Sequence, residues 1–273
     1  MINFYQEHKG YKTMIKTIIA IGGGEIGRIK IYPDNHSEQK PIETMVIDKK
    51  IIELTGKEHP ELVFIGAASG DDPKYFTAVQ NHFANRLGCN TFNLVLTDKP
   101  TIEQIRQKVL NADIIYVGGG SPTRLIKSLK ETGADNVLIE AYNKGIIMSG
   151  NSAGGCVWFE TYDNEDEEDF DGTVNTLKLK PALGLVKGYF VPHWNTKAET
   201  GLDTGSIPKD EIVKLLFKES ESGYAVDEGA AIMVQTDDNN NQTITQIVSK
   251  PGAQIYKLSP QLQQHINIGK SRE

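Results

Sequence analysis

The chain has 273 residues and a net charge of −7, with 38% hydrophobic and 24% charged residues, which suffices for one large α/β domain or two small ones. No Lys/Arg cluster offers the phosphate-neutralising face that nucleic acid requires, and no apolar run approaches the roughly 20 residues of a membrane helix. The first residues lack the apolar core of a signal peptide. The two cysteines give neither a disulfide framework nor a metal-ligand spacing. We therefore expect a cytoplasmic protein that contacts neither nucleic acid nor membrane.

Strand and helix patterns alternate from residue 16 to about residue 150, which favours βαβ units and a mostly parallel sheet. Later patterns are richer in strands, with a turn over DDNNNQ at 237–242. We expect strands at 16–24, 62–69, 91–96, 113–120, 145–150, 188–193, 223–229, 230–236, 242–249 and 254–258. We expect helices at 42–54, 73–88, 102–110, 121–133, 135–142 and 154–160.

The simplest organisation is an N-terminal extension over residues 1–15, a single domain over 16–260 and a C-terminal tail over 261–273. The fold class is a three-layer α/β sandwich with an antiparallel C-terminal extension. Three predicted strands end in glycine-rich segments: 22–24, 118–120 and 150–155. Ligands of open parallel sheets bind beyond the carboxyl ends of the strands. The glycine-rich segments, whose backbone has the greatest conformational freedom, thus lie where a site is expected.

A nucleophile elbow is predicted at Gly150-Asn151-Ser152-Ala153-Gly154, a G-x-S-x-G match between a strand and a predicted helix. In this motif a strained strand-to-helix turn exposes the serine oxygen, and small neighbours avoid clashes. We therefore expect Ser152 to be a nucleophile. The amide of Ala153 would then be one oxyanion donor, and the amide of Gly119 is our choice for the second.

A serine nucleophile needs a base, and His193 is the best placed of the six histidines. It closes the apolar strand GYFVPH and opens the polar loop WNTK, at the edge of the predicted sheet. The orienting acid is open at this stage. Glu228 in AVDEGAA is favoured, Asp227 competes with it, and the acidic run at 163–171 offers Asp166 or Glu167.

These motifs together resemble the peptidase E (aspartyl dipeptidase) and cyanophycinase family of serine peptidases. The resemblance rests on GGGEIGR, GGGSPTRL, GNSAGG, LGLVKGYFVPHW and DEG, and it runs from about Lys16 to Leu258. Peptidase E usually has Trp before its serine and Asn after its glycine triplet, where this chain has Asn151 and Ser121. The chain therefore resembles a side branch of the family rather than peptidase E proper.

The resemblance implies a fold like that of class I glutamine amidotransferases, with a flavodoxin-like parallel sheet covered by helices on both faces. It implies a catalytic serine at Ser152, a histidine at His193 and a glutamate at Glu228, or else an acid about fifteen residues after the serine. It also implies no metal and no organic cofactor. The expected substrate is a dipeptide or another short peptide, hydrolysed through an acyl-enzyme.

Substrate contacts are expected near the elbow, and the acidic run could cover the pocket and select against acidic substrates. Arg124 could act as the counter-ion of a substrate carboxylate. The residues expected to bind substrate are Gly120, Ser121, Arg124, Asn151 and Trp194. Alternatives are an esterase or thioesterase with the same apparatus, or a catalytically silent homologue that binds a peptide or metabolite. Whether the protein forms a homo-oligomer is left open.

The segment Gly22–Gly27 also matches G-x-G-x-x-G, the fingerprint of a dinucleotide site. That fingerprint requires a helix to begin within the motif, whereas the residues that follow contain two prolines and no helical period. We therefore expect these glycines to form a wall of the same pocket.

Overall fold

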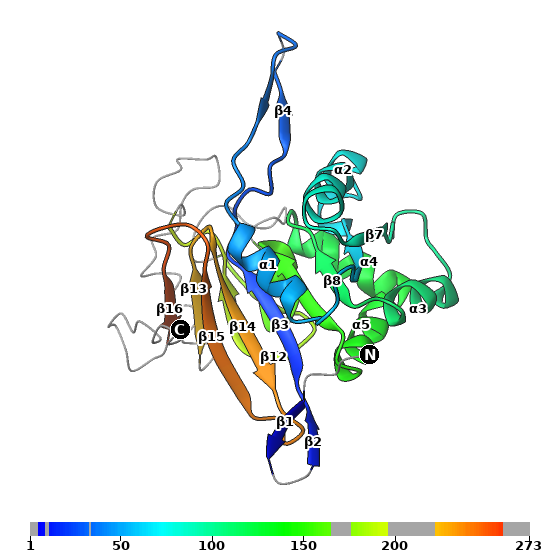
Figure 1. Ribbon diagram of the computed structural model, residues 1–273, viewed down its shortest axis with the longest axis vertical. Helices are drawn as coiled ribbons and strands as arrows, with labels where there is room; N and C mark the ends of the chain where they lie inside the picture. The colour runs from blue at the N-terminus through cyan, green and yellow to red at the C-terminus, as the bar shows by residue number, and fades with distance from the viewer. Residues whose placement is uncertain (1–4, 9–10, 33, 165–175, 196–221, 259–273) are drawn as a thin grey trace.

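The computed structural model describes residues 5–8, 11–32, 34–164, 176–195 and 222–258. Its centre is a seven-stranded sheet (Figure 1). From edge to edge the strands are β15 (Gln242–Val248), β14 (Ala230–Thr236), β3 (Lys16–Ile21), β9 (Ile147–Asn151), β8 (Ile114–Val117), β6 (Glu61–Ile65) and β7 (Asn90–Asn93). The five strands from β3 to β7 are parallel, whereas β14 is antiparallel to both of its neighbours, β3 and β15.

A second, five-stranded sheet lies beside the first. Its strands are β11 (Leu179–Pro181), β10 (Phe159–Asp163), β12 (Val186–Val191), β13 (Gly223–Val226) and β16 (Ile255–Leu258). The C-terminal strands therefore divide between two sheets. One hydrophobic cluster contains side chains of both sheets, such as Ile18 of β3 and Phe190 of β12, so the two sheets share a core.

Helices cover both faces of the central sheet because its buried strands alternate their apolar side chains between two cores. On β3, Ile18 belongs to the core under α3–α5, and Ile19 to the core under α1, α2 and η2. The helical elements are α1 (Met45–Glu53), η1 (Ala67–Ser69), α2 (Pro73–Val79), η2 (Gln80–Arg86), α3 (Ile102–Leu110), α4 (Pro122–Thr132), α5 (Ala134–Asn143) and α6 (Ala153–Cys156). The expected α/β class with a mostly parallel sheet and an antiparallel C-terminal part is confirmed.

Two hairpins extend from this body (Figure 1). The first, β1 (Tyr5–His8) with β2 (Tyr11–Met14), lies in the predicted N-terminal extension. The second, β4 (Ile29–Ile31) with β5 (Ser37–Gln39), occupies the connection that follows the first glycine-rich segment. Within the described residues no helix is long and apolar enough to cross a bilayer.

The helix expected over 154–160 is wrong in its length. Helix α6 ends at Cys156, and strand β10 begins at Phe159. The reason is tertiary: Trp158 and Phe159 are fully buried, and Phe159 stacks on Phe190 of the neighbouring strand with ring centroids 5.2 Å apart. Aromatic side chains of this kind favour a pleated surface over a helix.

Candidate active site

Ser152 lies in a sharp turn between strand β9 and helix α6. Its backbone has φ 55° and ψ −118°, a conformation that side-chain-bearing residues rarely adopt. Its amide donates to the Ile21 carbonyl at 2.9 Å, which fixes the turn on the neighbouring strand. The flanking glycines are required by space, because a Cβ on Gly150 would lie 2.0 Å from the Gly154 carbonyl oxygen. A Cβ on Gly154 would lie 2.1 Å from the Val117 carbonyl oxygen of β8, so the turn has room only for glycine at both positions.

His193 comes from the second sheet, two residues after β12 ends. It also has a positive φ of 54°, and its amide donates to the Gly22 carbonyl at 2.7 Å. The imidazole lies against the first glycine-rich segment, where a Cβ on Gly23 would meet the ring at 2.6 Å. Gly23 thus leaves the space that the ring occupies.

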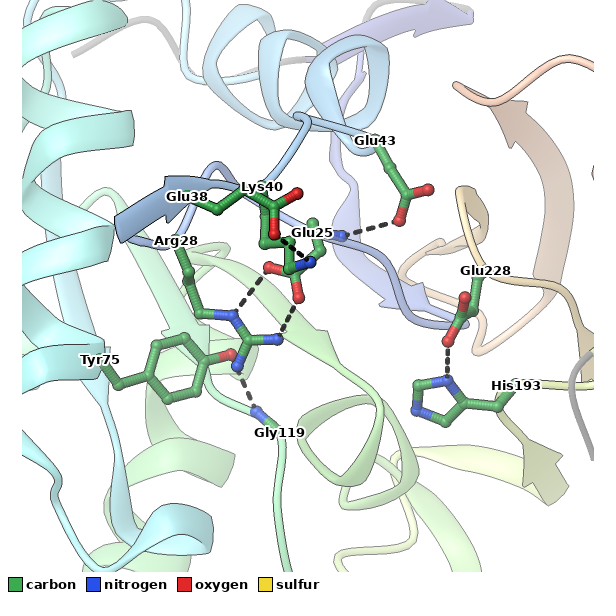
Figure 2. Close-up of polar contacts among 9 residues, drawn as sticks. All are labelled: Glu25, Arg28, Glu38, Lys40, Glu43, Tyr75, Gly119, His193 and Glu228. Carbon is green, nitrogen blue, oxygen red and sulfur yellow. Dashed lines mark hydrogen bonds and ion pairs between the residues drawn. The ribbon is translucent and has the colours of Figure 1, made fainter. Parts of the chain in front are cut away.

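The structure brings together Ser152, His193 and Glu228. His193 Nε2 lies 2.8 Å from Ser152 Oγ, and Nδ1 lies 2.8 Å from Glu228 Oε1; Figure 2 shows the second contact. An ionised carboxylate only accepts hydrogen bonds, so Nδ1–H donates to Glu228, and Nε2 is left to accept the serine proton. The arrangement can therefore remove a proton from Ser152 and stabilise the resulting imidazolium.

Glu228 and not Asp227 is the carboxylate that contacts His193. Asp227 Oδ2 instead accepts from the Gln254 amide at 2.9 Å. The Glu228 amide donates to Asn195 Oδ1 at 3.0 Å, which joins the β13–β14 loop to the His193 loop. The hydrogen bond from His193 holds the pKa of Glu228 below its usual value, against the opposing effect of partial burial.

The competing acidic run lies mostly outside the described residues, which end at position 164 and resume at 176. The roles proposed for Asp166, for Glu167 and for the run as a cover of the pocket therefore stay predictions. Of the first two residues of the run, Asp163 accepts a hydrogen bond from the Tyr189 hydroxyl. Asn164 is fully buried, and its Oδ1 accepts from the Lys178 amide at 2.6 Å.

Ser152, His193 and Glu228 open onto a cavity of about 780 Å³. As expected, the first glycine-rich segment forms one wall and the Gly119–Gly120 turn forms another. Its further lining residues are Gly24, Glu25, Ile26, Gly27, Arg28, Ile29, Glu43, Ser69, Asp72, Lys74, Tyr75, Thr77, Ala78, Asn81 and Asn151. A volume of this size is typical of a pocket for a small ligand.

Of the five residues expected to bind substrate, Gly120 and Asn151 line the cavity. Ser121 instead caps helix α4, because its hydroxyl accepts from the Arg124 amide at 2.9 Å. The side chain of Arg124 is exposed on that helix, outside the cavity lining. Trp194 packs on Tyr256 in the small core of the second sheet. Direct substrate contact thus has structural support at two of the five positions.

The charged residues of the cavity were not singled out from the sequence. Arg28 forms a two-pronged ion pair with Glu25 at 2.8 and 2.6 Å, and this hydrogen bonding raises the pKa of Arg28 (Figure 2). Glu43 accepts from the Glu25 amide at 3.2 Å and from Lys250 Nζ at 2.7 Å. The only clue in the sequence was the GGGEIGR segment itself. No group of three or more His, Cys, Asp or Glu side chains among the described residues could hold a metal ion.

Tyr75 of α2 is a second residue that sequence reasoning missed. Its hydroxyl oxygen accepts from the Gly119 amide at 3.2 Å, so the amide expected to bind an oxyanion already has a partner (Figure 2). The Ala153 amide occupies the first position of α6, where no partner exists within the helix. The two expected oxyanion donors therefore lie in different environments.

Comparison with known proteins identifies the family. The model of peptidase family S51 matches residues 35–242. The chain is 32% identical over 244 residues to "Uncharacterized peptidase YgaJ" of Bacillus subtilis (strain 168), covering 89% of this chain and 92% of that protein. It is also 32% identical over 95 residues to "Uncharacterized peptidase Lmo0363" of Listeria monocytogenes serovar 1/2a, covering 35% of this chain and 46% of that protein.

A solved structure shares the fold. The crystal structure of a peptidase from an acI-B1 Actinobacterium superposes with a TM-score of 0.61 at 18% identity, covering 93% of this chain and 97% of that one. The resemblance to the peptidase E and cyanophycinase family is thereby confirmed. The chain belongs to peptidase family S51 and is a serine-type peptidase.

Proposed function

We propose that the protein hydrolyses dipeptides and other short peptides through an acyl-enzyme on Ser152, with His193 as general base and Glu228 as its orienting acid. The observation that carries this proposal is the unbroken hydrogen-bond series from Ser152 Oγ through the imidazole to Glu228 Oε1, with both distances at 2.8 Å. The series opens on the cavity rather than on a buried core.

The reaction follows from these atoms. His193 Nε2 takes the Ser152 proton as Oγ bonds to the peptide carbonyl carbon, and the carbonyl oxygen becomes an oxyanion facing the Ala153 amide. The C–N bond then breaks, and His193 returns the proton to the leaving amine. Water activated by the same imidazole hydrolyses the ester and regenerates Ser152.

The cavity favours a short substrate with charged ends. Its walls combine the carboxylates of Glu25, Glu43 and Asp72 with the cations of Arg28 and Lys74. Such a mixed lining suits a zwitterion, because an ammonium and a carboxylate group can each meet an opposite charge within one small molecule. An extended protein substrate would bring no comparable pair of charged ends close to the scissile bond.

A panel of dipeptides, isoaspartyl dipeptides, longer peptides and simple esters tests the proposal, with Ser152→Ala as control. We expect turnover of dipeptides that the control lacks. A fluorophosphonate, from which Ser152 Oγ displaces fluoride, should label the wild type and not the control. Ester turnover without peptide turnover would favour an esterase, and an unlabelled Ser152 would favour a silent binding protein.

A further inference from the structure

The hydroxyl of Tyr75 is linked to the reacting serine through Gly119. Its hydrogen-bond partner Gly119 adjoins the nucleophile directly, because a Cβ on Gly119 would lie 3.3 Å from Ser152 Cβ. Tyr75 also lines the same cavity as Ser152 and His193. In Figure 2 its hydroxyl points toward the side of the cavity where His193 lies.

The hydrogen bond to this hydroxyl leaves its proton available. The oxygen accepts from the Gly119 amide at 3.2 Å. A phenol oxygen that accepts from an N–H group has its own O–H left to donate.

The ring of Tyr75 is held on three sides. It packs on Phe64 with ring centroids 5.1 Å apart, and a Cβ on Gly118 would lie 2.9 Å from it. The Arg28 guanidinium, itself fixed by Glu25, lies 5.8 Å from the ring centroid. A donor fixed in this way has to reorganise little when negative charge develops beside it.

We propose that the Tyr75 hydroxyl is the second oxyanion donor of this peptidase, opposite the Ala153 amide, and that Gly119 acts by donating into the phenol oxygen. The oxyanion formed by attack of Ser152 accepts the Tyr75 O–H, which stays bonded to its own oxygen throughout. The N–H group of Gly119 withdraws electron density from the phenol oxygen, and this strengthens its donation.

The protonation state of Tyr75 agrees with this role. Burial raises the pKa of Tyr75, and it outweighs the opposing effects of the Gly119 amide, Arg28 and Asn151. The hydroxyl therefore keeps its proton at neutral pH and is able to donate it.

Replacement by phenylalanine separates this proposal from its alternative, because the two predict changes of opposite sign. If Tyr75 is the donor, Tyr75→Phe lowers kcat by about 10²- to 10³-fold with KM nearly unchanged. If Tyr75 only occupies the Gly119 amide, Tyr75→Phe frees that amide for the oxyanion, and kcat stays the same or rises. The second result would overturn the proposal.

Tyr116→Phe is the matched control. Tyr116 is a fully buried tyrosine of strand β8 in the central sheet, and its hydroxyl has no hydrogen-bond partner among the described residues. Its replacement should leave kcat and KM unchanged. Circular dichroism would set an assay temperature at which all variants are folded, so that lost stability cannot pass for lost catalysis.

The inference rests on the proposed serine mechanism, and a second readout keeps the two apart. The rate of fluorophosphonate labelling at Ser152 depends on stabilising the developing P–O charge, and it needs no known peptide substrate. Labelling absent in the wild type contradicts the mechanism and with it the role of Tyr75. Labelling present in the wild type and equally fast in Tyr75→Phe overturns the role of Tyr75 alone.

Discussion

Two carboxylate–histidine pairs with almost the same hydrogen-bond length lie in very different surroundings. Glu228 contacts His193 at 2.8 Å on the cavity wall, where the histidine side chain is 35% exposed. Asp48 contacts His82 at 2.7 Å in the core between α1 and η2, where both side chains are completely buried.

The second nitrogen of each imidazole makes the chemical difference. In His193 it faces Ser152 Oγ, so the ring can take a proton and pass it on. In His82 it accepts from Arg86 at 3.1 Å, because a guanidinium can only donate. Asp48 Oδ2 also accepts from the Thr44 hydroxyl at 2.6 Å. In the Asp48–His82 pair both ring nitrogens therefore have structural partners, and the pair stabilises packing. In the Glu228–His193 pair one ring nitrogen faces Ser152 Oγ and can take its proton.

Loss of the nucleophile or base should give the largest effect on activity. We expect Ser152→Ala and His193→Ala each to lower kcat by about 10⁴-fold or more, since each removes the proton-transfer step. Ser149→Ala, three residues earlier in strand β9, is the matched control. Its hydroxyl donates to the Ile115 carbonyl in the core, so steady-state kinetics should be unchanged. Comparable loss in the control would contradict the assignment.

Loss of the orienting carboxylate should come next. Glu228→Gln keeps the side-chain size but no longer stabilises the imidazolium, and we expect kcat to fall about 10³- to 10⁴-fold. Asp227→Asn, in the adjacent position, replaces the charged acceptor of the Gln254 amide by a neutral one and should affect stability rather than kcat. If instead the Asp227 variant were the inactive one, the acid would have been misassigned.

Disruption of the buried pair should change stability without changing chemistry. His82→Leu leaves the Asp48 carboxylate buried without its main partner, at an expected cost of about 3–5 kcal/mol in the free energy of unfolding. Urea titration measures this loss, and kcat of the folded enzyme should stay at the wild-type value. The double variant Asp48→Leu/His82→Leu removes both polar groups and should recover much of the loss. A fall in kcat at unchanged stability would contradict a structural role.

The smallest expected effect is the pH dependence of stability that Glu228 contributes. Its pKa in the folded protein lies below the usual value, so its stabilising contribution is present above the unfolded pKa of about 4.3. That contribution is lost as pH falls through the lower folded value. The difference in Tm between wild type and Glu228→Gln should therefore shrink from pH 6 to pH 3. A difference that widens on acidification would mean that the shift has the opposite sign.

The elbow and the fold class could be predicted from the sequence because their causes are local. The clash that forces glycine at position 150 is with the carbonyl of Gly154, only four residues further along the chain. The alternation of apolar strands and amphipathic helices likewise predicts a parallel sheet before any contact is known. The same local reasoning failed after Cys156, where packing of Trp158 and Phe159 replaced the expected helix by a strand.

The sequence by itself determined the α/β class, the turn at Ser152 and the candidacy of His193. Only the tertiary structure decided that Glu228 rather than Asp227 faces His193, and that Tyr75 meets Gly119 across 44 residues of chain. The physical reason is that these choices depend on how separate loops and helices are oriented. Neighbouring carboxylates have the same local chemistry, and a tyrosine at the start of a helix carries no sign of which glycine amide the fold will bring to its hydroxyl.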